Sequence, residues 1–252
     1  MISNPVRVIA RLDIKSNSVV KGINLEGLRK VGDPKELAKK YYKEGIDEII
    51  YMDVVASLYE RNTIEKFIKV AAKEIFVPLT VGGGIRNLED IRKVLNNGAD
   101  KVAINTAAIK NENFIKEASQ EIGSQSIIVS IEAKKVEKNN WEAYYDNGRE
   151  RSGLNVLDWA KKAQDLGAGE VLITSVDNEG LKKGMDLELL KRLRDIVSIP
   201  IIFSGGVGQV EHIIDVVPNT DAVALASVLH YNEYSIKFLK DILYKKGINV
   251  RS

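Results

Sequence analysis

Short apolar runs alternate with amphipathic stretches along the whole chain, and this alternation predicts the secondary structure. The apolar runs are rich in Val, Ile and Leu, which predicts buried β-strands, and the stretches between them have the periodicity of α-helices. The predicted strands are Val6–Leu12, Glu48–Asp53, Pro78–Val81, Lys101–Ile104, Ser126–Ile131, Glu170–Thr174, Pro200–Phe203 and Ala222–Leu225. Strands and helices in alternation are typical of parallel βα units.

The segments between the strands also carry helix start and stop signals. Asp33 followed by Pro34 predicts an N-cap with proline at the first helical position, and several amphipathic segments end in glycine. Eight βα units in a chain of 252 residues favour a closed barrel over an open doubly wound sheet. We therefore predict one α/β domain, a (β/α)8 TIM barrel that spans residues 1–252.

The second half of the chain repeats the first. AKKYYKEGIDEIIYMDV, from Ala38, aligns with AKKAQDLGAGEVLITSV, from Ala160. VPLTVGGG, from Val77, aligns with IPIIFSGG, from Ile199, at the same offset. RLDIK is likewise similar to SIEAK, and GADKVAINTAAI to NTDAVALASVLH. A shared offset across strands and turns predicts a barrel built from two similar half-barrels.

Two long segments follow equivalent strands of the two halves. Lys15–Gly32 follows the first strand and Lys134–Ser152 the fifth, and both are expected to be irregular in the main. Loops of this length in a compact domain are usually lids or binding loops. The second contains EKNNWEAYYDNGRE, which predicts a small β-hairpin with its turn at Asp146, Asn147 and Gly148.

Composition narrows the class of protein. The chain is 44% hydrophobic and 29% charged, and its net charge of +2 comes from interleaved acidic and basic residues, so we expect a soluble protein with no nucleic-acid partner. The absence of cysteine excludes disulfides and thiolate chemistry. The two histidines lack neighbouring ligands, so no metal or other cofactor is predicted. No apolar stretch suits a signal peptide or a membrane span, so we expect a cytoplasmic enzyme.

Glycine turns occupy matching places in the two halves. Val81–Gly84 and Ser204–Gly206 each follow a strand and precede a helix, where backbone N–H groups can bind an anion. The next strand of each half ends in small or hydroxyl-bearing residues: Asn105 and Thr106 in the first, Ala226 and Ser227 in the second. This repetition predicts two phosphate sites and an elongated ligand with a phosphate at each end. The alternative is that the glycines only permit tight turns.

Carboxylates end two equivalent strands. Asp13 ends the first strand and Glu132 the fifth, and a buried acidic side chain is costly unless a site uses it or a partner neutralises it. Two facing carboxylates in different environments suit general acid and base roles. Structural ion pairs with Lys15 or Lys134 are the alternative. Two further aspartates near strand ends leave the assignment open: Asp53 and Asp177.

Charged residues also start four of the strands. They are Arg7, Glu48, Lys101 and Glu170. At the strand-start end of a barrel such charges usually form stabilising salt bridges, and the pattern by itself supports only that interpretation.

Motifs along nearly the whole chain resemble the cyclase subunit of imidazole glycerol phosphate synthase, the HisF family. They are RLDIK, VVKG, DPKELA, GIDE, VGGGI, GADKVAINTAA, GSQ, GAGEVLITSVD, SGGVG and ALASV. The resemblance implies a lyase/cyclase of histidine biosynthesis. A partner glutaminase of the HisH type, in a heterodimer, releases ammonia that travels through the barrel. The cyclase combines it with a bis-phosphorylated formimino-AICAR ribonucleotide (PRFAR) to give imidazole glycerol phosphate and AICAR.

The resemblance also implies roles for particular residues. Asp13 matches an essential general acid/base, Glu132 stands where the family has its second catalytic aspartate, and Lys21 matches a lysine of a loop that closes over substrate. Two phosphate sites are implied, with Gly84, Asn105 and Thr106 at one and Gly180, Gly206, Ala226 and Ser227 at the other. The charged strand-start residues Arg7, Glu48, Lys101 and Glu170 match a ring that forms the family's ammonia inlet. The resemblance therefore replaces the interpretation that these four residues only stabilise the barrel. Asp100 falls where the glutaminase docks.

Four departures from the family pattern lie at or near the catalytic mouth. They are Glu132 for aspartate, Leu181 in place of a threonine, Arg11 for a small cysteine, and Val55 for a threonine. The inlet residues match the family, whereas residues at the catalytic mouth do not, and this leaves an alternative open. The chain would then be a paralogue that channels ammonia for amidation of a surface-polysaccharide sugar and has little cyclase activity. A third hypothesis, the sister phosphosugar isomerase, is disfavoured by the ring and by GSQ at Gly123.

Overall fold

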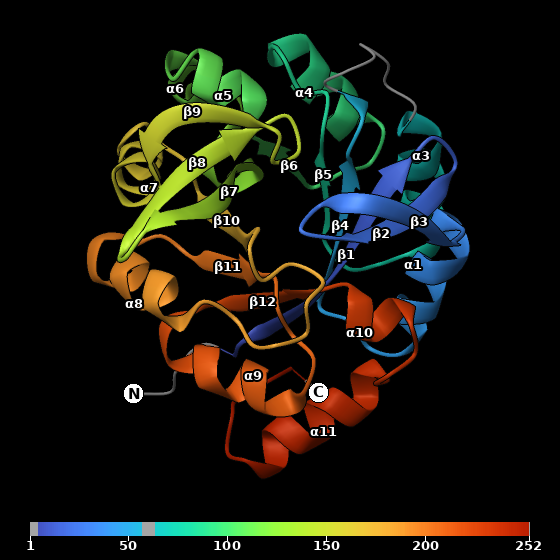
Figure 1. The fold of residues 1–252 in the computed structure, drawn as a ribbon. Helices are drawn as coiled ribbons and strands as arrows, with labels where there is room; N and C mark the ends of the chain where they lie inside the picture. Colours follow the sequence, from blue (N-terminus) through green and yellow to red (C-terminus); the bar gives the residue numbers. More distant parts are fainter. Residues whose placement is uncertain (1–4, 57–63, 252) are drawn as a thin grey trace.

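Eight parallel strands close into a barrel in the computed structural model, which describes residues 5–56 and 64–251 (Figure 1). The strands are β1 (Arg7–Lys15), β4 (Glu48–Asp53), β5 (Leu79–Gly82), β6 (Lys101–Ile104), β7 (Ile127–Glu137), β10 (Glu170–Ser175), β11 (Ile201–Ser204) and β12 (Ala222–Leu225). Neighbours pair in the order β10-β11-β12-β1-β4-β5-β6-β7, and β7 pairs with β10 to close the circle. The predicted closed (β/α)8 barrel is confirmed, with strand ends that differ from the predicted ones by at most six residues.

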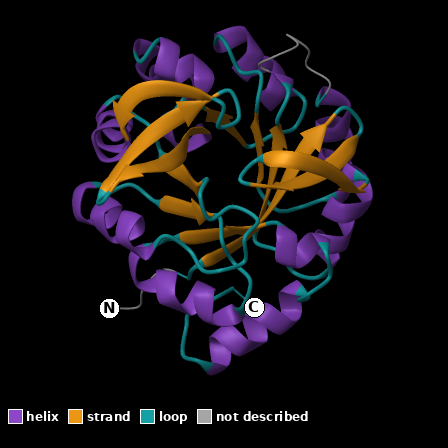
Figure 2. Cartoon of the chain, in the orientation of Figure 1, coloured by secondary structure: helices purple, strands orange, loops and turns teal. Residues whose placement is uncertain are grey.

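Helices surround the barrel on its outside (Figure 2). They are α1 (Pro34–Lys43), α3 (Glu65–Glu74), α4 (Leu88–Asn96), α5 (Thr106–Lys110), α6 (Asn113–Ile122), α7 (Val156–Asp165), α8 (Leu187–Ile196), α9 (Val210–Val216), α10 (Ser227–His230) and α11 (Ile236–Lys245), with 3₁₀ turns at Ser124–Ser126 and Val217–Asn219. The predicted N-cap is present, because the Asp33 carboxylate accepts hydrogen bonds from the N–H groups of Lys35 and Glu36. Within the described residues, no helix is long and apolar enough to cross a membrane.

The segment after β1 is a β-hairpin, so the expectation of an irregular loop there was wrong. β2 (Ser18–Ile23) pairs antiparallel with β1, and β3 (Glu26–Gly32) pairs with β2. Asn24 and Leu25 form the turn with φ angles of 51° and 64°. Two successive positive φ angles suit a tight hairpin turn, but leucine seldom adopts them, so no turn signal could be recognised at these residues.

The predicted second hairpin is present, and β7 contributes a third strand to it. β8 (Asn140–Tyr145) pairs with the extended end of β7, and β9 (Glu150–Asn155) pairs with β8. The turn between β8 and β9 lies at Asp146, Asn147 and Gly148, which all have positive φ angles. The two hairpins therefore extend equivalent strands of the two halves, and they lie on opposite sides of the barrel opening (Figure 1).

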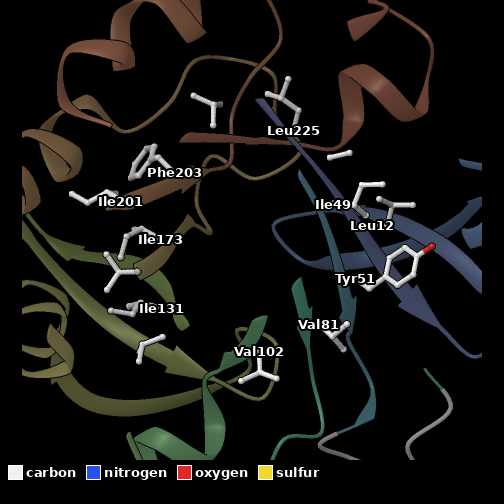
Figure 3. Close-up of a cluster of buried hydrophobic side chains, with 14 of the residues drawn as sticks. Leu12, Ile49, Tyr51, Val81, Val102, Ile131, Ile173, Ile201, Phe203 and Leu225 are labelled. Carbon is white, nitrogen blue, oxygen red and sulfur yellow. The ribbon is translucent and has the colours of Figure 1, made fainter. Parts of the chain in front are cut away.

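Two apolar layers hold the barrel together. The larger lies between strands and helices and includes Leu12, Tyr51 and Phe203, all fully buried (Figure 3). Successive strand residues alternate between the two faces of the sheet. The strand residues that face inward therefore form a second, smaller cluster in the barrel lumen. Its members are Ile9, Ile50, Ala103, Ile128, Leu172, Ile202, Ala222 and Ala224. Each large aliphatic side chain buried in this way contributes about 1.5–3 kcal/mol.

Candidate active site

Asp13 and Glu132 lie buried at the barrel mouth, where the carboxyl ends of the parallel strands meet. Asp13 is 4% exposed and Glu132 is 7% exposed. Neither residue ends its strand, because β1 and β7 both continue into their hairpins, and the hairpins help to bury the two carboxylates. The negative charge of Asp13 acts on Glu132. The structure thus brings together the two carboxylates that the sequence singled out.

Asp13 forms an ion pair with Arg11, a residue two positions earlier on the same strand. The Arg11 Nε atom donates to Asp13 Oδ1 at 2.8 Å, and a terminal guanidinium nitrogen donates to Thr174 Oγ1 at 2.7 Å. Burial alone would lower the pKa of Arg11, but three carboxylates outweigh burial and raise that pKa above its ordinary value: Asp13, Glu179 and Glu132. Arg11 is therefore a permanent cation within the mouth.

Glu132 accepts a hydrogen bond from a backbone amide of the second hairpin. The N–H of Gly148 donates to its Oε2 at 2.7 Å. Burial raises the pKa of Glu132 to about 7, although Gly148 and Arg11 both act to lower it. Among the described residues, neither Lys15 nor Lys134 forms a salt bridge with these carboxylates, so the predicted alternative ion pairs are wrong. Glu132 can consequently hold or release a proton near neutral pH.

A cavity of about 800 Å³ adjoins Glu132 on the side of the first glycine turn. The residues predicted for the first phosphate site, Gly84, Asn105 and Thr106, line it together with Gly83. Gly83 has φ 88°, and a Cβ atom there would lie 2.1 Å from the Asp53 carbonyl oxygen, so the turn requires glycine. Two cations that sequence reasoning missed also line the cavity, Arg86 and Lys110. Their signal was one basic residue shortly after the first glycine turn and another shortly after Thr106.

The equivalent site in the second half is nearly closed. Its cavity is only about 20 Å³ and is lined by Gly180, Gly205, Gly206, Ala226 and Ser227, among others. A Cβ atom on Gly206, with φ 101°, would lie 2.0 Å from the carbonyl oxygen of Gly184, so this turn also requires glycine. Both sets of predicted phosphate-site residues therefore line cavities at the mouth.

The first hairpin packs on the loop that carries Gly180. Lys21 forms a buried ion pair with Glu179 of this loop. The N–H of Asn24 donates to the Glu179 carbonyl oxygen at 2.8 Å. A Cβ atom on Gly180 would lie 2.5 Å from the Gly22 carbonyl oxygen. The predicted loop lysine thus belongs to strand β2 of the hairpin, and its side chain connects the hairpin to the second half of the barrel.

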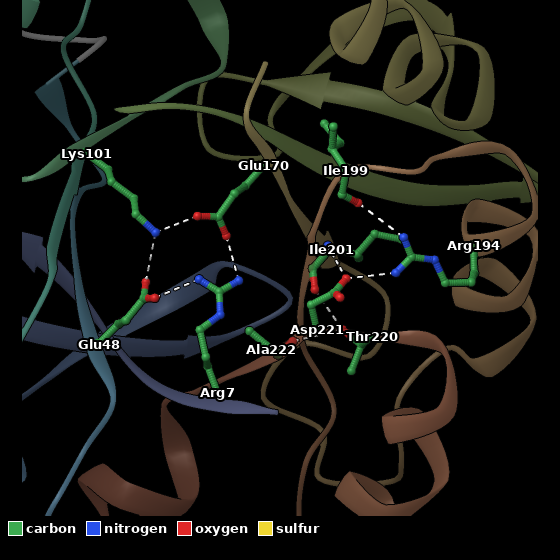
Figure 4. A network of polar contacts seen from close by, with 10 residues as sticks. All are labelled: Arg7, Glu48, Lys101, Glu170, Arg194, Ile199, Ile201, Thr220, Asp221 and Ala222. Atoms are coloured by element: carbon green, nitrogen blue, oxygen red, sulfur yellow. Dashed lines mark hydrogen bonds and ion pairs between the residues drawn. The ribbon is translucent and has the colours of Figure 1, made fainter. Parts of the chain in front are cut away.

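A closed ring of ion pairs lies at the other end of the lumen (Figure 4). Arg7 contacts Glu48 and Glu170, each at 2.6 Å, and Lys101 contacts Glu170 at 2.5 Å and Glu48 at 3.4 Å. Burial would raise the pKa of Glu170, but Arg7 and Lys101 outweigh it and lower that pKa. Asp100, beside the ring, accepts a hydrogen bond from the Leu79 N–H at 2.8 Å. All four predicted ring residues meet.

Comparisons with known proteins agree with this architecture. A family model described as histidine biosynthesis protein matches residues 7–235. A relative from Legionella pneumophila, named imidazole glycerol phosphate synthase subunit HisF, is 54% identical over 206 residues, which cover 82% of this chain and 97% of the relative. Relatives of the same name from Petrotoga mobilis and Pyrococcus furiosus are 49% and 48% identical, and each match covers 97% of this chain and 98% of the relative. The chain belongs to the HisF family.

The departures from the HisF pattern have distinct positions in the structure. Arg11 and Glu132 lie in the mouth itself, in the contacts described above. Leu181 is 37% exposed on the loop after β10. Val55 follows β4, and its N–H donates to Asp53 Oδ1 at 3.1 Å. Two departures therefore lie at the buried carboxylates, and the other two lie in neighbouring loops.

Proposed function

We propose that this member of the HisF family is the cyclase subunit of an imidazole glycerol phosphate synthase, a lyase/cyclase of histidine biosynthesis. One observation carries the proposal: two buried carboxylates share the barrel mouth with two glycine-turn cavities, and a charged ring lies at the opposite end of the same lumen. The substrate is the bis-phosphorylated ribonucleotide PRFAR, and the products are imidazole glycerol phosphate and AICAR.

The substrate lies across the mouth with one phosphate in each half of the barrel. Arg86 and Lys110 neutralise the phosphate of the first cavity, together with the N–H groups of the glycine turn. The second phosphate binds at Gly180, Gly206 and Ser227, where the first hairpin lies alongside. This placement holds the reacting centre between Asp13 and Glu132.

The two carboxylates divide the proton transfers. Asp13 is held by Arg11 and acts as the group that orients and deprotonates the incoming nitrogen. Glu132, with its pKa raised to about 7, exchanges a proton at the other face of the substrate. Different environments for similar groups are the usual means of separating an acid from a base.

Ammonia comes from a glutaminase subunit docked on the strand-start face. The ring of Arg7, Glu48, Lys101 and Glu170 surrounds the inlet, and the apolar layer above it provides a path for a small neutral molecule. The partner fits the HisH type, and Asp100 beside the ring contributes to docking.

The test uses the purified chain, excess ammonium and PRFAR, with AICAR release as the readout. We expect turnover with ammonium alone, and turnover with glutamine once a cognate glutaminase is added. Asp100→Ala and Lys101→Ala should lower glutamine-dependent turnover and leave ammonium-dependent turnover near wild type. The control is Arg192→Ala, because Arg192 lies on the outer helix α8 and pairs with Glu188 of the same helix. No AICAR release under either condition would contradict the proposal and favour the ammonia-channelling paralogue.

A further inference from the structure

The lumen contains a third layer between the apolar cluster and the carboxylates. Arg7, Ile9, Arg11 and Asp13 are alternate residues of β1 and therefore face the same side of the strand. Arg7 belongs to the ring and Ile9 to the lumen cluster. Arg11 consequently lies above the apolar layer and directly below Asp13.

Arg11 crosses the lumen rather than contacting a neighbouring strand. It starts on β1 and donates to Thr174 on β10, while β11 and β12 lie between these two strands in the sheet. Its other hydrogen bond holds Asp13. The residue is only 3% exposed. A planar guanidinium bound at two points and enclosed on all sides has a fixed orientation.

The second half-barrel has no equivalent of this cation. In the repeat, SIEAK aligns with RLDIK, so Ser130 takes the place of Arg11 and Glu132 that of Asp13. Glu132 is bound by a backbone amide of its hairpin instead. The arginine therefore makes the two carboxylates different although their backbone positions are equivalent.

We propose that Arg11 is a positioning residue: it fixes the Asp13 carboxylate at the top of the lumen and forms the cationic barrier that the nitrogen nucleophile passes to reach both carboxylates. This inference rests on the proposed function for the identity of that nucleophile. A fixed positive charge repels ammonium and does not repel neutral ammonia, so it favours the species that has a free electron pair for attack. The bond to Thr174 keeps the charge in this place.

Several charged groups face Arg11 and Glu132, and they set the electrostatic consequence. Asp13 comes from β1, and Glu179 comes from the loop after β10, where it pairs with Lys21 of the first hairpin. His230 of α10 contacts the backbone of Arg11 and is acted on by the charge of Asp13. Arg11 acts to lower the pKa of Glu132, while burial and Asp13 act to raise it. Removal of the arginine charge should therefore raise the pKa of Glu132 above its value of about 7. That change can be measured without any turnover.

Three variants separate the charge, the geometry and the anchor. Arg11→Met removes the charge and both hydrogen bonds at similar length. Arg11→Lys keeps the charge without the planar fork, and Thr174→Val removes only the far anchor. The control is Thr80→Val, the same change at a buried hydroxyl on β5 that forms no hydrogen bond within the described residues. Two readouts are taken: the titration of the Glu132 carboxyl by carbon-13 NMR, assigned with Glu132→Gln, and kcat and KM with ammonium.

We expect Arg11→Met to raise the Glu132 midpoint and to lower kcat at least about tenfold, with KM changed much less. Arg11→Lys should keep the midpoint and lower kcat, Thr174→Val should lower kcat about fivefold, and Thr80→Val should change neither quantity. If Arg11→Met does not fold, Arg11→Lys and Thr174→Val decide the matter by the same criteria. Unchanged kcat in these variants, or an equal loss in Thr80→Val, would overturn the inference. A wild-type chain without turnover would refute the proposed function, and an unchanged Glu132 midpoint in Arg11→Met would then refute the role of Arg11 separately.

Discussion

In the first half-barrel, β1 carries Asp13, which is paired with Arg11, and continues into a hairpin. This hairpin contacts the second half through the ion pair of Lys21 with Glu179. In the second, β7 carries a glutamate bound by the turn of its own hairpin. Both halves have the same order of strands and a hairpin after the equivalent strand, so the difference at the two carboxylates lies in the groups that contact them. Duplication of a half-barrel places two carboxylates at equivalent points, and substitution at a neighbouring position then makes them chemically distinct.

The two glycine-turn cavities differ in the same manner. The first is about 800 Å³ and contains Arg86 and Lys110, whereas the second is about 20 Å³ and no lysine or arginine is among its described lining residues. The repeat aligns Arg86 with Gly208 and Lys110 with Tyr231. One glycine turn thus has cationic side chains beside it, whereas the described lining of the other offers N–H and hydroxyl donors. The repeat predicts where such cavities lie, and we expect the side chains around each cavity to set how strongly it binds an anion.

The largest expected effect is the loss of turnover in Asp13→Asn. The amide cannot act as a base or pair with Arg11, so ammonium-dependent turnover should fall by roughly 10²–10⁴-fold. Glu132→Asp restores the shorter carboxylate and should retain or improve turnover. AICAR release measured side by side for the two variants tests whether the halves differ in importance. Robust turnover that survives Asp13→Asn would contradict our view of both carboxylates.

The second prediction concerns the stability of the folded protein against pH. Burial raises the pKa of Glu132 from an ordinary value of 4.5 to about 7, so the folded state favours the protonated form. The resulting stabilisation is complete below pH 4.5 and is lost as the pH rises through 7. Between pH 4.5 and pH 7 the unfolding free energy of wild type should therefore fall by about 3 kcal/mol more than that of Glu132→Gln.

Urea unfolding at pH 5 and pH 8 measures this difference. Glu137→Gln is the matched control, because it changes an exposed carboxylate on the same strand. It should follow the wild-type dependence. Identical pH dependence in wild type and Glu132→Gln would show that Glu132 does not hold its proton in the folded state, and the proposed division of roles between the halves would fail.

Sequence reasoning predicted the features that depend on local patterns. Apolar runs located the strands, the Asp33 cap located a helix start, and the repeat located both glycine turns. The ring could be predicted too, because charges at strand starts of a closed barrel must converge on its axis. In each of these cases the decisive residues are close in sequence or are related by the barrel symmetry.

The missed features depend on contacts between distant residues. The partner of Arg11 on β10 is 163 positions away, and its identity depends on how side chains cross the lumen. The hydrogen bond from the Gly148 N–H to Glu132 depends on the register of the hairpin, and a shift of that register by one residue would remove it. The first hairpin was missed because its turn contains Leu25 at positive φ. Such features follow from packing rather than from any local pattern.

The smallest expected effect concerns phosphate affinity in the two cavities. Because Arg86 supplies a charge that the second half lacks, inorganic phosphate should bind the first site more tightly. Arg86→Ala should weaken that binding about tenfold, as expected for the loss of one charge-assisted hydrogen bond. Calorimetry with phosphate gives the affinity. Arg92→Ala is the control, since it removes an exposed arginine of α4 that pairs with Glu121.

A crystal soaked in phosphate then shows which half is occupied first. Occupancy at Gly84 and Thr106 before Gly206 and Ser227 would support the charge difference as the cause of unequal binding. The reverse order would mean that the small second cavity binds more tightly through close N–H donors alone. In that case the backbone N–H groups of the turn, and not a charged side chain beside it, would set the affinity. Unchanged affinity in Arg86→Ala would support the same conclusion. The guanidinium, which donates to the Ala56 carbonyl oxygen at 2.9 Å, would then contribute nothing to phosphate binding.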